Sequence, residues 1–343
     1  MKKSFYSYSG AVCAGLILLL WAPGSLLAQT ADNAKDSSMV NVVNPGETWH
    51  DTQGNVIQAH APGIIKVKST WYWFGEDKTD GSPFQNVRCY SSNDLINWEF
   101  RTDALTRQDS GDLGPNRIIE RPKVLYNRST KTYVMYVHVD DHSYREAKVG
   151  VATSKSPDGP YSYIGSFSPL GHQSRDMTIW QDDDGTGYLI FEDRQRGVCI
   201  ALLSPDYLTV VKEVALIPHS YEAPAVVKVA GVYYLLGSHL SGWSTNPNQY
   251  TTAPSMAGPW SDYKDVAPGS PNTYDSQTAF ILQVGGKKTT SYIYMGDRWR
   301  PNNLSDSRYM WMPLQVGDGV MSLPAPTPWT IDVKSGTITT IPQ

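Results

Sequence analysis

Short runs of β-forming and aromatic residues recur along the chain, separated by turn residues. Five of these runs share one form, an aromatic-rich segment that ends in a small or acidic residue: WYWFGED (71–77), YVMYVHVD (133–140), YLIFED (188–193), YYLLGS (233–238) and YIYMGD (292–297). Each follows a shorter run and a turn such as Asp-Gly or Gly-Gly, which is the pattern of a β-hairpin. After most of them the pattern continues with a third strand and a further turn.

This repeat predicts the fold class. Nothing after about residue 40 shows a long helical period, and repeats of about four strands without helices are typical of β-propellers. We therefore predict an all-β protein that forms a five-bladed β-propeller. A β-sandwich with coincidental spacing of its strands is the alternative.

The start of each repeat carries a polar residue at an equivalent place. The first strand of every propeller blade lines the central channel, so these residues should form a ring around one mouth of it: His60, Glu120, Asp176, Glu222 and Gln277. Neighbouring carboxyl groups cannot all ionise cheaply, so one is held protonated and can donate while another stays ionised and can activate water. That pair of roles is the chemistry of glycosidic bond cleavage.

Residues near the predicted ring complete the candidate site. Trp243 and Trp299 could stack on a sugar, although both could equally belong to the core, and Asn246 and Arg298 could bind hydroxyl groups. Two further candidates, each with a structural alternative, are Glu76, which could bind a sugar hydroxyl or face Lys78, and Tyr144, which could contact substrate or lie on the surface.

The composition favours a neutral ligand. Aromatic residues make up 11% of the chain and charged residues 18%, and the formal net charge is −4. Nucleic-acid binding needs a basic stripe, which the sequence lacks. We expect a polysaccharide or oligosaccharide partner and no nucleic acid. The GxSxG, HExxH, Walker and dinucleotide-binding motifs are absent from the sequence, and no cofactor is predicted.

Three features that suggest metals or disulfides have plainer interpretations. His60 has no second His at ligand spacing, so we interpret it as a hydrogen-bonded side chain and predict no metal. DDDGTG (182–187) has the early spacing of an EF-hand loop but lies between two predicted strands, which favours a hairpin turn. Cys89 and Cys199 fall in different repeats, which favours two buried free thiols over a disulfide.

The N-terminus has the pattern of a secretory signal. Two Lys residues precede the apolar run AVCAGLILLLWAPG, and small residues end at Ala28. We expect a signal peptide at 1–28, a flexible lead-in at 29–40 and the catalytic propeller at 41–343. The protein is then secreted or periplasmic, with no membrane span after removal of the signal. A membrane anchor is the alternative, but the apolar run is short for a span of about 20 residues.

These residues resemble glycoside hydrolase family 43, a family of inverting five-bladed propeller enzymes, over essentially the whole chain after the signal. In that family a Glu at the start of the fourth blade is the general acid, matched here by Glu222 in YEAPAV. An Asp that opens the third blade tunes the pKa of the acid, matched by Asp176 in SRDMTIW. The usual base, an Asp that opens the first blade, is replaced by His60 in AHAPGI.

Within the family the sequence is similar to the exo-β-1,3-galactanases, also called galactan 1,3-β-galactosidases, which lack the first-blade Asp. IIERPKVLYN supplies Glu120, DDHSYREAKVGVA supplies Tyr144, YDSQTAFI supplies Gln277, and SGWSTNPN and MGDRW also match. The resemblance implies Glu120 or Gln277 as the base. Because an amide is a very poor base, Glu120 is the better candidate if it can reach the water.

The hypothesis is an inverting hydrolase that releases terminal galactose from β-1,3-galactan, with Glu222 as general acid. One alternative is a β-xylosidase or α-L-arabinofuranosidase on the same scaffold, against which the missing first-blade Asp counts. Another is a sugar-binding propeller without catalysis, which His60 favours. A non-enzymatic interaction scaffold is a weaker third.

Overall fold

The structure, a computed structural model, describes residues 41–342. The predicted signal peptide and lead-in lie outside the described residues. The regular elements between 41 and 342 are strands and three single 3₁₀ turns, η1 (Gly111–Leu113), η2 (Pro169–Gly171) and η3 (Leu304–Asp306). The all-β prediction is therefore confirmed.

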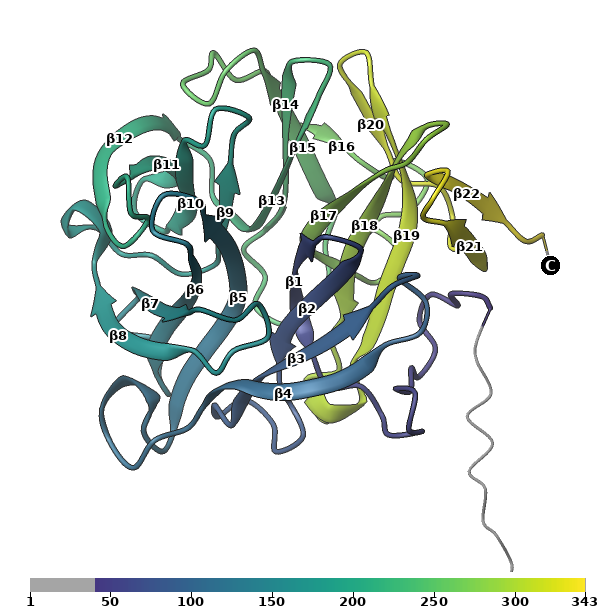
Figure 1. Cartoon of the computed structure of the whole chain (residues 1–343). Coiled ribbons are helices and arrows are strands. Elements are labelled where there is room, and N and C mark those ends of the chain that lie inside the picture. Colours follow the sequence, from purple (N-terminus) through teal and green to yellow (C-terminus); the bar gives the residue numbers. More distant parts are fainter. Residues whose placement is uncertain (1–40, 343) are drawn as a thin grey trace, which may run out of the picture. The chain divides into compact units, whose positions relative to one another are not determined.

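The strands form five antiparallel sheets of four strands, each built from consecutive strands of the chain (Figure 1). The predicted five-bladed propeller is confirmed. In chain order the blades are β1 (His60–Val67), β2 (Thr70–Glu76), β3 (Asn86–Ser92) and β4 (Glu99–Thr106); β5 (Arg117–Asn127), β6 (Thr132–Asp141), β7 (Lys148–Ser154) and β8 (Ser162–Phe167); β9 (Met177–Gln181), β10 (Gly187–Asp193), β11 (Gly197–Leu203) and β12 (Val210–Ile217); β13 (Tyr221–Val229), β14 (Val232–His239), β15 (Asn248–Ala253) and β16 (Lys264–Asp265); β17 (Gln277–Gly285), β18 (Thr290–Arg298), β19 (Arg308–Gly317) and β20 (Val320–Ser322).

The core lies between the blades. Each pair of neighbouring blades shares one cluster of buried apolar side chains. Successive side chains of a strand point to opposite faces of its sheet, so Trp73 packs against the fifth blade and Phe74 against the second. Both faces of each blade are buried, which explains why the recurring aromatic runs are apolar at consecutive positions.

The segments before the first blade and after the last are joined by backbone pairing. β21 (Trp329–Asp332) and β22 (Thr337–Thr340) form a hairpin. The amide of Val43 donates to the carbonyl of Trp329 at 2.7 Å, and the amide of Trp329 donates back at 3.0 Å. Trp329 is fully buried in the cluster between the first and fifth blades. The sequence analysis did not predict this closure.

His60 also closes the ring of blades. Its Nδ1 lies 2.9 Å from Oδ1 of Asp297 on β18, and the backbone N–H of Ala61 donates to Oδ2 of the same carboxylate at 2.9 Å. His60 and Asp297 are fully buried, and the imidazole stacks on Tyr309. The interpretation of His60 as a hydrogen-bonded side chain is confirmed.

Replacing Asp297 by Asn should destabilise the fold. If the amide nitrogen faced the Ala61 N–H, that buried donor would lose its acceptor. If it faced the His60 ring, Nδ1 would have to accept, and the proton would move to Nε2, which is buried without a hydrogen-bond partner among residues 41–342. Either arrangement leaves a buried donor unpaired, at a cost of about 2–4 kcal/mol. The melting temperature should fall by roughly 5–10 °C, measured by differential scanning calorimetry. Asp109→Asn, at an exposed position, is the control and should melt like the wild type. A melting temperature of Asp297→Asn within about 2 °C of the wild type would contradict the closing role.

The segment 182–187 is a hairpin turn, as predicted. It joins β9 to β10, and Oδ1 of Asp184 accepts the backbone N–H of Thr186 at 2.8 Å. Nζ of Lys228 lies 2.7 Å from Oδ1 of Asp182. Cys89 and Cys199 are buried free thiols, which confirms that prediction too.

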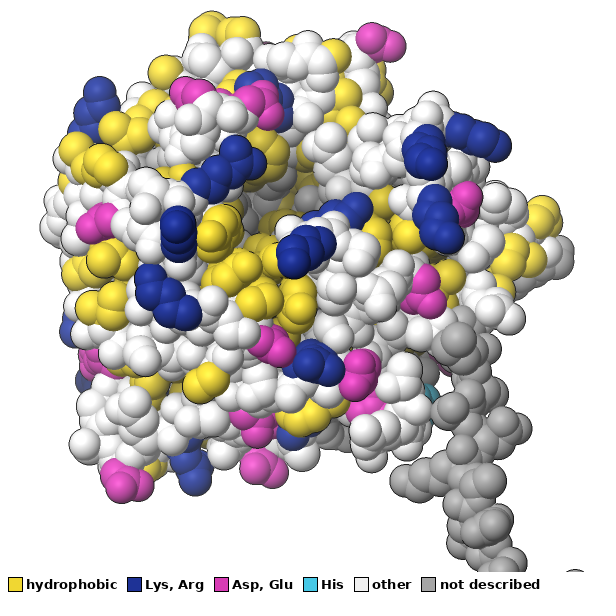
Figure 2. All heavy atoms as spheres, in the orientation of Figure 1, with side chains coloured by type: hydrophobic (Ala, Val, Ile, Leu, Met, Phe, Trp, Pro, Cys, Tyr) yellow, Lys and Arg dark blue, Asp and Glu magenta, His cyan; other side chains and the backbone are white. Residues whose placement is uncertain are grey.

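Two surface properties bear on partners. Between residues 41 and 342 we find no helix with the length and apolar character needed to span a bilayer. On the face drawn in Figure 2, the Lys and Arg side chains stand among apolar and acidic ones and do not merge into one continuous basic patch.

Candidate active site

A pocket of about 270 Å³ opens where the first strands of the blades begin. We call it the central pocket. Side chains from all five blades line it: Glu76, Glu120, Arg121, His138, Tyr144, Arg175, Asp176, Glu192, Arg194, Glu222, Trp243, Gln277 and Trp299, with the backbone of Gly242. Four of the five predicted ring residues therefore meet in one cavity.

A β-bulge lies at or next to the ring residue in four blades. In three of them the residue before a proline has a positive φ, 47° at Ala61, 55° at Arg121 and 55° at Ala223, which costs roughly 1–2 kcal/mol for each residue. In each case its backbone N–H donates to a carboxylate of the preceding blade. Arg121 donates to Glu76 at 2.8 Å, and Ala223 donates to Asp176 at 3.1 Å. These charged hydrogen bonds hold the strained backbone and lock neighbouring blades together.

Glu222 is 5% exposed. Its Oε1 accepts the Nε2–H of Gln277 at 2.9 Å. Burial, followed by the nearby charges of Asp176 and Glu192, raises the pKa of Glu222 to about 9, against the opposing pull of Arg121 and Arg194. Glu222 is thus protonated at neutral pH and can donate a proton.

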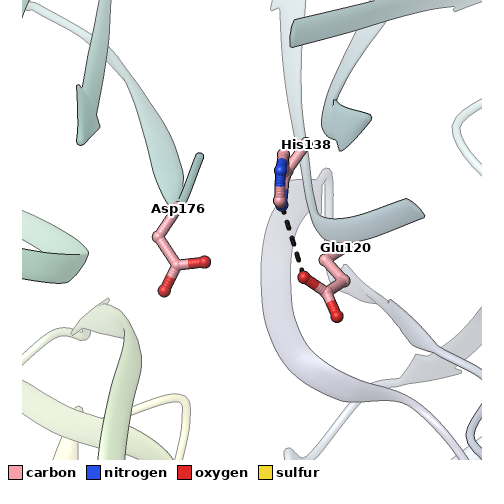
Figure 3. A group of neighbouring side chains, drawn as sticks. All are labelled: Glu120, His138 and Asp176. Carbon is pink, nitrogen blue, oxygen red and sulfur yellow. Dashed lines mark ion pairs between the residues drawn. The ribbon is translucent and has the colours of Figure 1, made fainter. Parts of the chain in front are cut away.

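Glu120 has the opposite electrostatics. Burial alone would raise its pKa, but Lys78 and then His138 hold the pKa of this carboxyl well below its usual range. Oε1 accepts the hydroxyl of Tyr144 at 2.9 Å and lies 3.5 Å from Nζ of Lys78, and Oε2 lies 3.3 Å from Nδ1 of His138. Figure 3 shows the His138–Glu120 pair with Asp176 opposite, on a neighbouring blade. Glu120 is therefore an ionised carboxylate in the same pocket as the protonated Glu222.

All polar atoms of the Gln277 amide are engaged. Its Oε1 accepts from Nη2 of Arg121 at 2.6 Å and from Nε1 of Trp299 at 3.0 Å. Its Nε2 donates to Glu222 at 2.9 Å and to the hydroxyl of Ser238 at 3.1 Å. The amide is fixed with its NH₂ group toward the protonated acid, and its oxygen already has two donors.

Arg121 joins the ring residues across the channel. Its Nη2 lies 2.8 Å from Oδ2 of Asp176, and its Nη1 donates to the carbonyl of Thr278 at 3.1 Å. Because Asp176 also accepts the Ala223 N–H, it is held next to the residue that follows Glu222. This position explains its effect on the pKa of Glu222.

The remaining predicted residues divide into two groups. Glu76, Tyr144, Trp243 and Trp299 line the pocket, and the two indoles pack edge to face with centroids 5.1 Å apart. The structure does not bring Asn246 and Arg298 to the pocket lining. The Asn246 side chain bonds both backbone groups of His239, and Arg298 donates to the carbonyl of Tyr274 at 2.8 Å. Both are occupied with holding loops.

A second ring lies beside the first, and of its members the sequence analysis named only Glu76 as a site residue. Strand pairing or a backbone hydrogen bond joins one residue of each second strand to each ring residue: Glu76 to His60, His138 to Glu120, Glu192 to Asp176, Ser238 to Glu222 and Asp297 to Gln277. The signal was present, because each lies within the last three residues of a recurring aromatic run. Arg121, Arg175 and Arg194 were also missed.

Two groups of side chains have the composition of metal ligands. One is Glu120, His138 and Asp176, and the other is Asp176, Glu192 and Glu222. Their carboxylates already lie against cations, since Asp176 pairs with Arg121, Glu120 with Lys78 and Glu192 with Arg194. A metal ion would have to displace these pairs, so the arrangement fits proton transfer better than metal binding.

Several known proteins are similar to this chain in sequence, and solved structures are similar to it in fold as well. A β-D-galactofuranosidase of Aspergillus niger is 30% identical over 69% of each chain. The crystal structure of an exo-β-1,3-galactanase from Phanerochaete chrysosporium, solved with β-1,3-galactotriose, is 44% identical with a TM-score of 0.85, covering 88% of this chain and 71% of that one. An exo-β-1,3-galactanase from Clostridium thermocellum is 38% identical with a TM-score of 0.84, over 88% and 68% of the two chains.

The sequence profile of glycosyl hydrolases family 43 matches residues 54–289. This match spans every strand of the first four blades and the first strand of the fifth, β17, and it includes the ring residues from His60 to Gln277. The chain belongs to glycoside hydrolase family 43.

Proposed function

We propose that the protein is an exo-β-1,3-galactanase that releases terminal galactose from β-1,3-galactan with inversion of configuration. The observation that carries this proposal is one pocket in which Glu222 is held protonated and Glu120 ionised. The similarity to two exo-β-1,3-galactanases, at 44% and 38% identity, supports the choice of sugar and linkage.

In the proposed reaction Glu222 donates its proton to the glycosidic oxygen as the bond from that oxygen to C1 of the terminal galactose breaks. A water molecule attacks C1 from the opposite face, and Glu120 takes the proton that this water loses. The product is α-galactose, and Glu222 is left ionised while Glu120 is left protonated. Proton exchange with solvent restores both groups.

Other pocket residues have supporting roles in this proposal. Asp176 keeps the pKa of Glu222 high and holds the backbone that follows it. Gln277 orients the carboxyl group of Glu222, and Arg121 orients both Asp176 and Gln277. Trp243 and Trp299 offer indole surface to the sugar, while Tyr144 and Glu76 present oxygens to its hydroxyls. The signal-like pattern at 1–28 supports secretion.

The test is product analysis on β-1,3-galactan, with the anomer followed by proton NMR. We expect galactose to be released from the chain end with the α-anomer formed first. Galactofuranosides, arabinan and xylan oligosaccharides are the comparison substrates, and we expect them to react at least 100-fold more slowly. Initial formation of the β-anomer would contradict inversion. Binding of galactan without any release would favour the sugar-binding alternative.

A further inference from the structure

The mechanism above leaves one buried carboxyl group of the central pocket unused. Glu192, on β10, is 2% exposed. One oxygen from each of Asp176, Glu192 and Glu222 lies within 4.8 Å of the others. Three acids at this separation cannot all ionise cheaply, so the place of the proton depends on the cation that each one has.

Glu192 is rigidly held. Its backbone N–H donates to the carbonyl of Asp176 at 2.9 Å, and its own carbonyl accepts the N–H of Arg175 at 3.1 Å. Oε1 accepts from Nε of Arg194 at 2.7 Å. Oε2 is buried and has no hydrogen-bond partner among residues 41–342. One oxygen is thus anchored, and the other acts on its surroundings through its charge alone.

Cations are distributed unequally over the three acids. Asp176 pairs with Arg121 at 2.8 Å and Glu192 with Arg194 at 2.7 Å, whereas the hydrogen bond described for Glu222 comes from a neutral amide. The cluster therefore places its proton on Glu222. The charged groups around Glu192 are Arg175 and Asp176 before β9, Arg194 after β10, His138 on β6, Arg121 on β5 and Glu222 on β13.

We propose that Glu192 is a positioning residue for the general acid: held by Arg194, it sets a second negative charge beside Glu222 and keeps that acid protonated at alkaline pH. This proposal rests on the proposed function, because it takes Glu222 as the proton donor. Asp176, just before β9, supplies the first such charge. Glu192 supplies the second from β10 of the same blade.

The titration order fits this role. Burial and then Asp176 raise the pKa of Glu192 to about 7, and that of Glu222 is raised to about 9. As the pH rises, Glu192 loses its proton first, and its new charge then opposes ionisation of Glu222. The enzyme stays active at a higher pH than it would with Asp176 alone.

The test is the pH profile of Glu192→Gln on β-1,3-galactan. We expect the alkaline limb of kcat/KM to move down by about one pH unit, with the rate at pH 5 within about threefold of the wild type. Arg194→Gln, at a half-exposed position, removes a cation from the cluster and should move the limb upward. Glu213→Gln, in the outer strand of the same blade, is the matched control and should leave the profile unchanged.

Each outcome bears on the proposal. An alkaline limb in Glu192→Gln that stays within about 0.3 pH units of the wild type, or moves up, would overturn it. An equal loss of rate at every pH would instead indicate a structural role and would also overturn it. If Glu192→Gln does not fold, Arg194→Gln provides the test. A downward shift of its alkaline limb would then overturn the proposal.

A second measurement separates this proposal from the proposed function. The carboxyl titration of Glu222 can be followed by infrared spectroscopy without substrate. Subtracting the spectrum of the Glu222→Gln variant from that of the protein with Glu222 isolates the carboxyl band of this residue. Its midpoint should be about one pH unit lower in the Glu192→Gln background. A lower midpoint in a protein without galactanase activity would refute the activity and retain the coupling, while an unchanged midpoint would refute the coupling.

Discussion

Replacing Glu222 by Gln should lower kcat on β-1,3-galactan by about 10³–10⁴-fold, the size of effect expected for loss of general acid catalysis. The amide has nearly the same shape, and its oxygen can still accept the Nε2–H that Gln277 donates to Glu222 at 2.9 Å. Substrate binding should therefore change little, and KM should stay within about threefold of the wild type. Steady-state kinetics with reducing-sugar detection would measure both constants.

The leaving group provides a control for this result. The 4-nitrophenolate of a 4-nitrophenyl β-galactoside leaves as a stable anion and needs little protonation. The same variant should therefore lose only about 10- to 50-fold in activity on this substrate, against about 10³-fold or more on galactan. Glu99→Gln, at an exposed position on β4, should match the wild type on both substrates. Equal losses on galactan and on the aryl galactoside would argue against Glu222 as the proton donor.

The pH profile follows from the same carboxyl group. A general acid must be protonated to act, and the raised pKa of Glu222, about 9, keeps it protonated through neutral pH. The value of kcat/KM should therefore fall as the pH rises through about 9, and this alkaline limb should disappear in Glu222→Gln. The lowered pKa of Glu120 leaves that group ionised through mildly acidic pH. Activity should therefore persist at pH values below the ordinary pKa of a Glu side chain.

Much of the fold was predictable because the propeller repeats one pattern. Each blade buries both of its faces, so the second strand of every blade shows the same aromatic run. The residues that open the first strand of every blade also align. Glu120, Asp176, Glu222 and Gln277 were assigned to one pocket from that alignment alone, and all four line it. The geometry of a symmetric fold turns equivalent positions in sequence into neighbours in space.

The unpredicted features depend on contacts between distant segments. His60 was placed in the ring, yet it turns into the core because Asp297, 237 residues later, binds its imidazole. Asn246 and Arg298 look like sugar ligands in sequence but satisfy backbone groups of loops. Glu192 was missed because its position facing Asp176 follows from strand register, which the irregular spacing of the repeats conceals.

The identity of the base should be revealed by azide. Glu120→Ala should lose about 10³-fold or more in kcat, since no ionised carboxylate then accepts the proton of the attacking water. Azide needs no deprotonation, so it should restore turnover of an aryl β-galactoside in this variant and form α-galactosyl azide. Product anomers would be assigned by NMR.

Gln277→Ala provides the contrasting variant. The Gln277 oxygen already accepts from Arg121 and Trp299, and its nitrogen donates to Glu222, so it has the contacts of an orienting group. This variant should lose activity because Glu222 and Arg121 become less well held, and azide should not restore it, since the water would still have Glu120 as its base. Recovery by azide in Gln277→Ala but not in Glu120→Ala would reverse the assignment and make the amide the base.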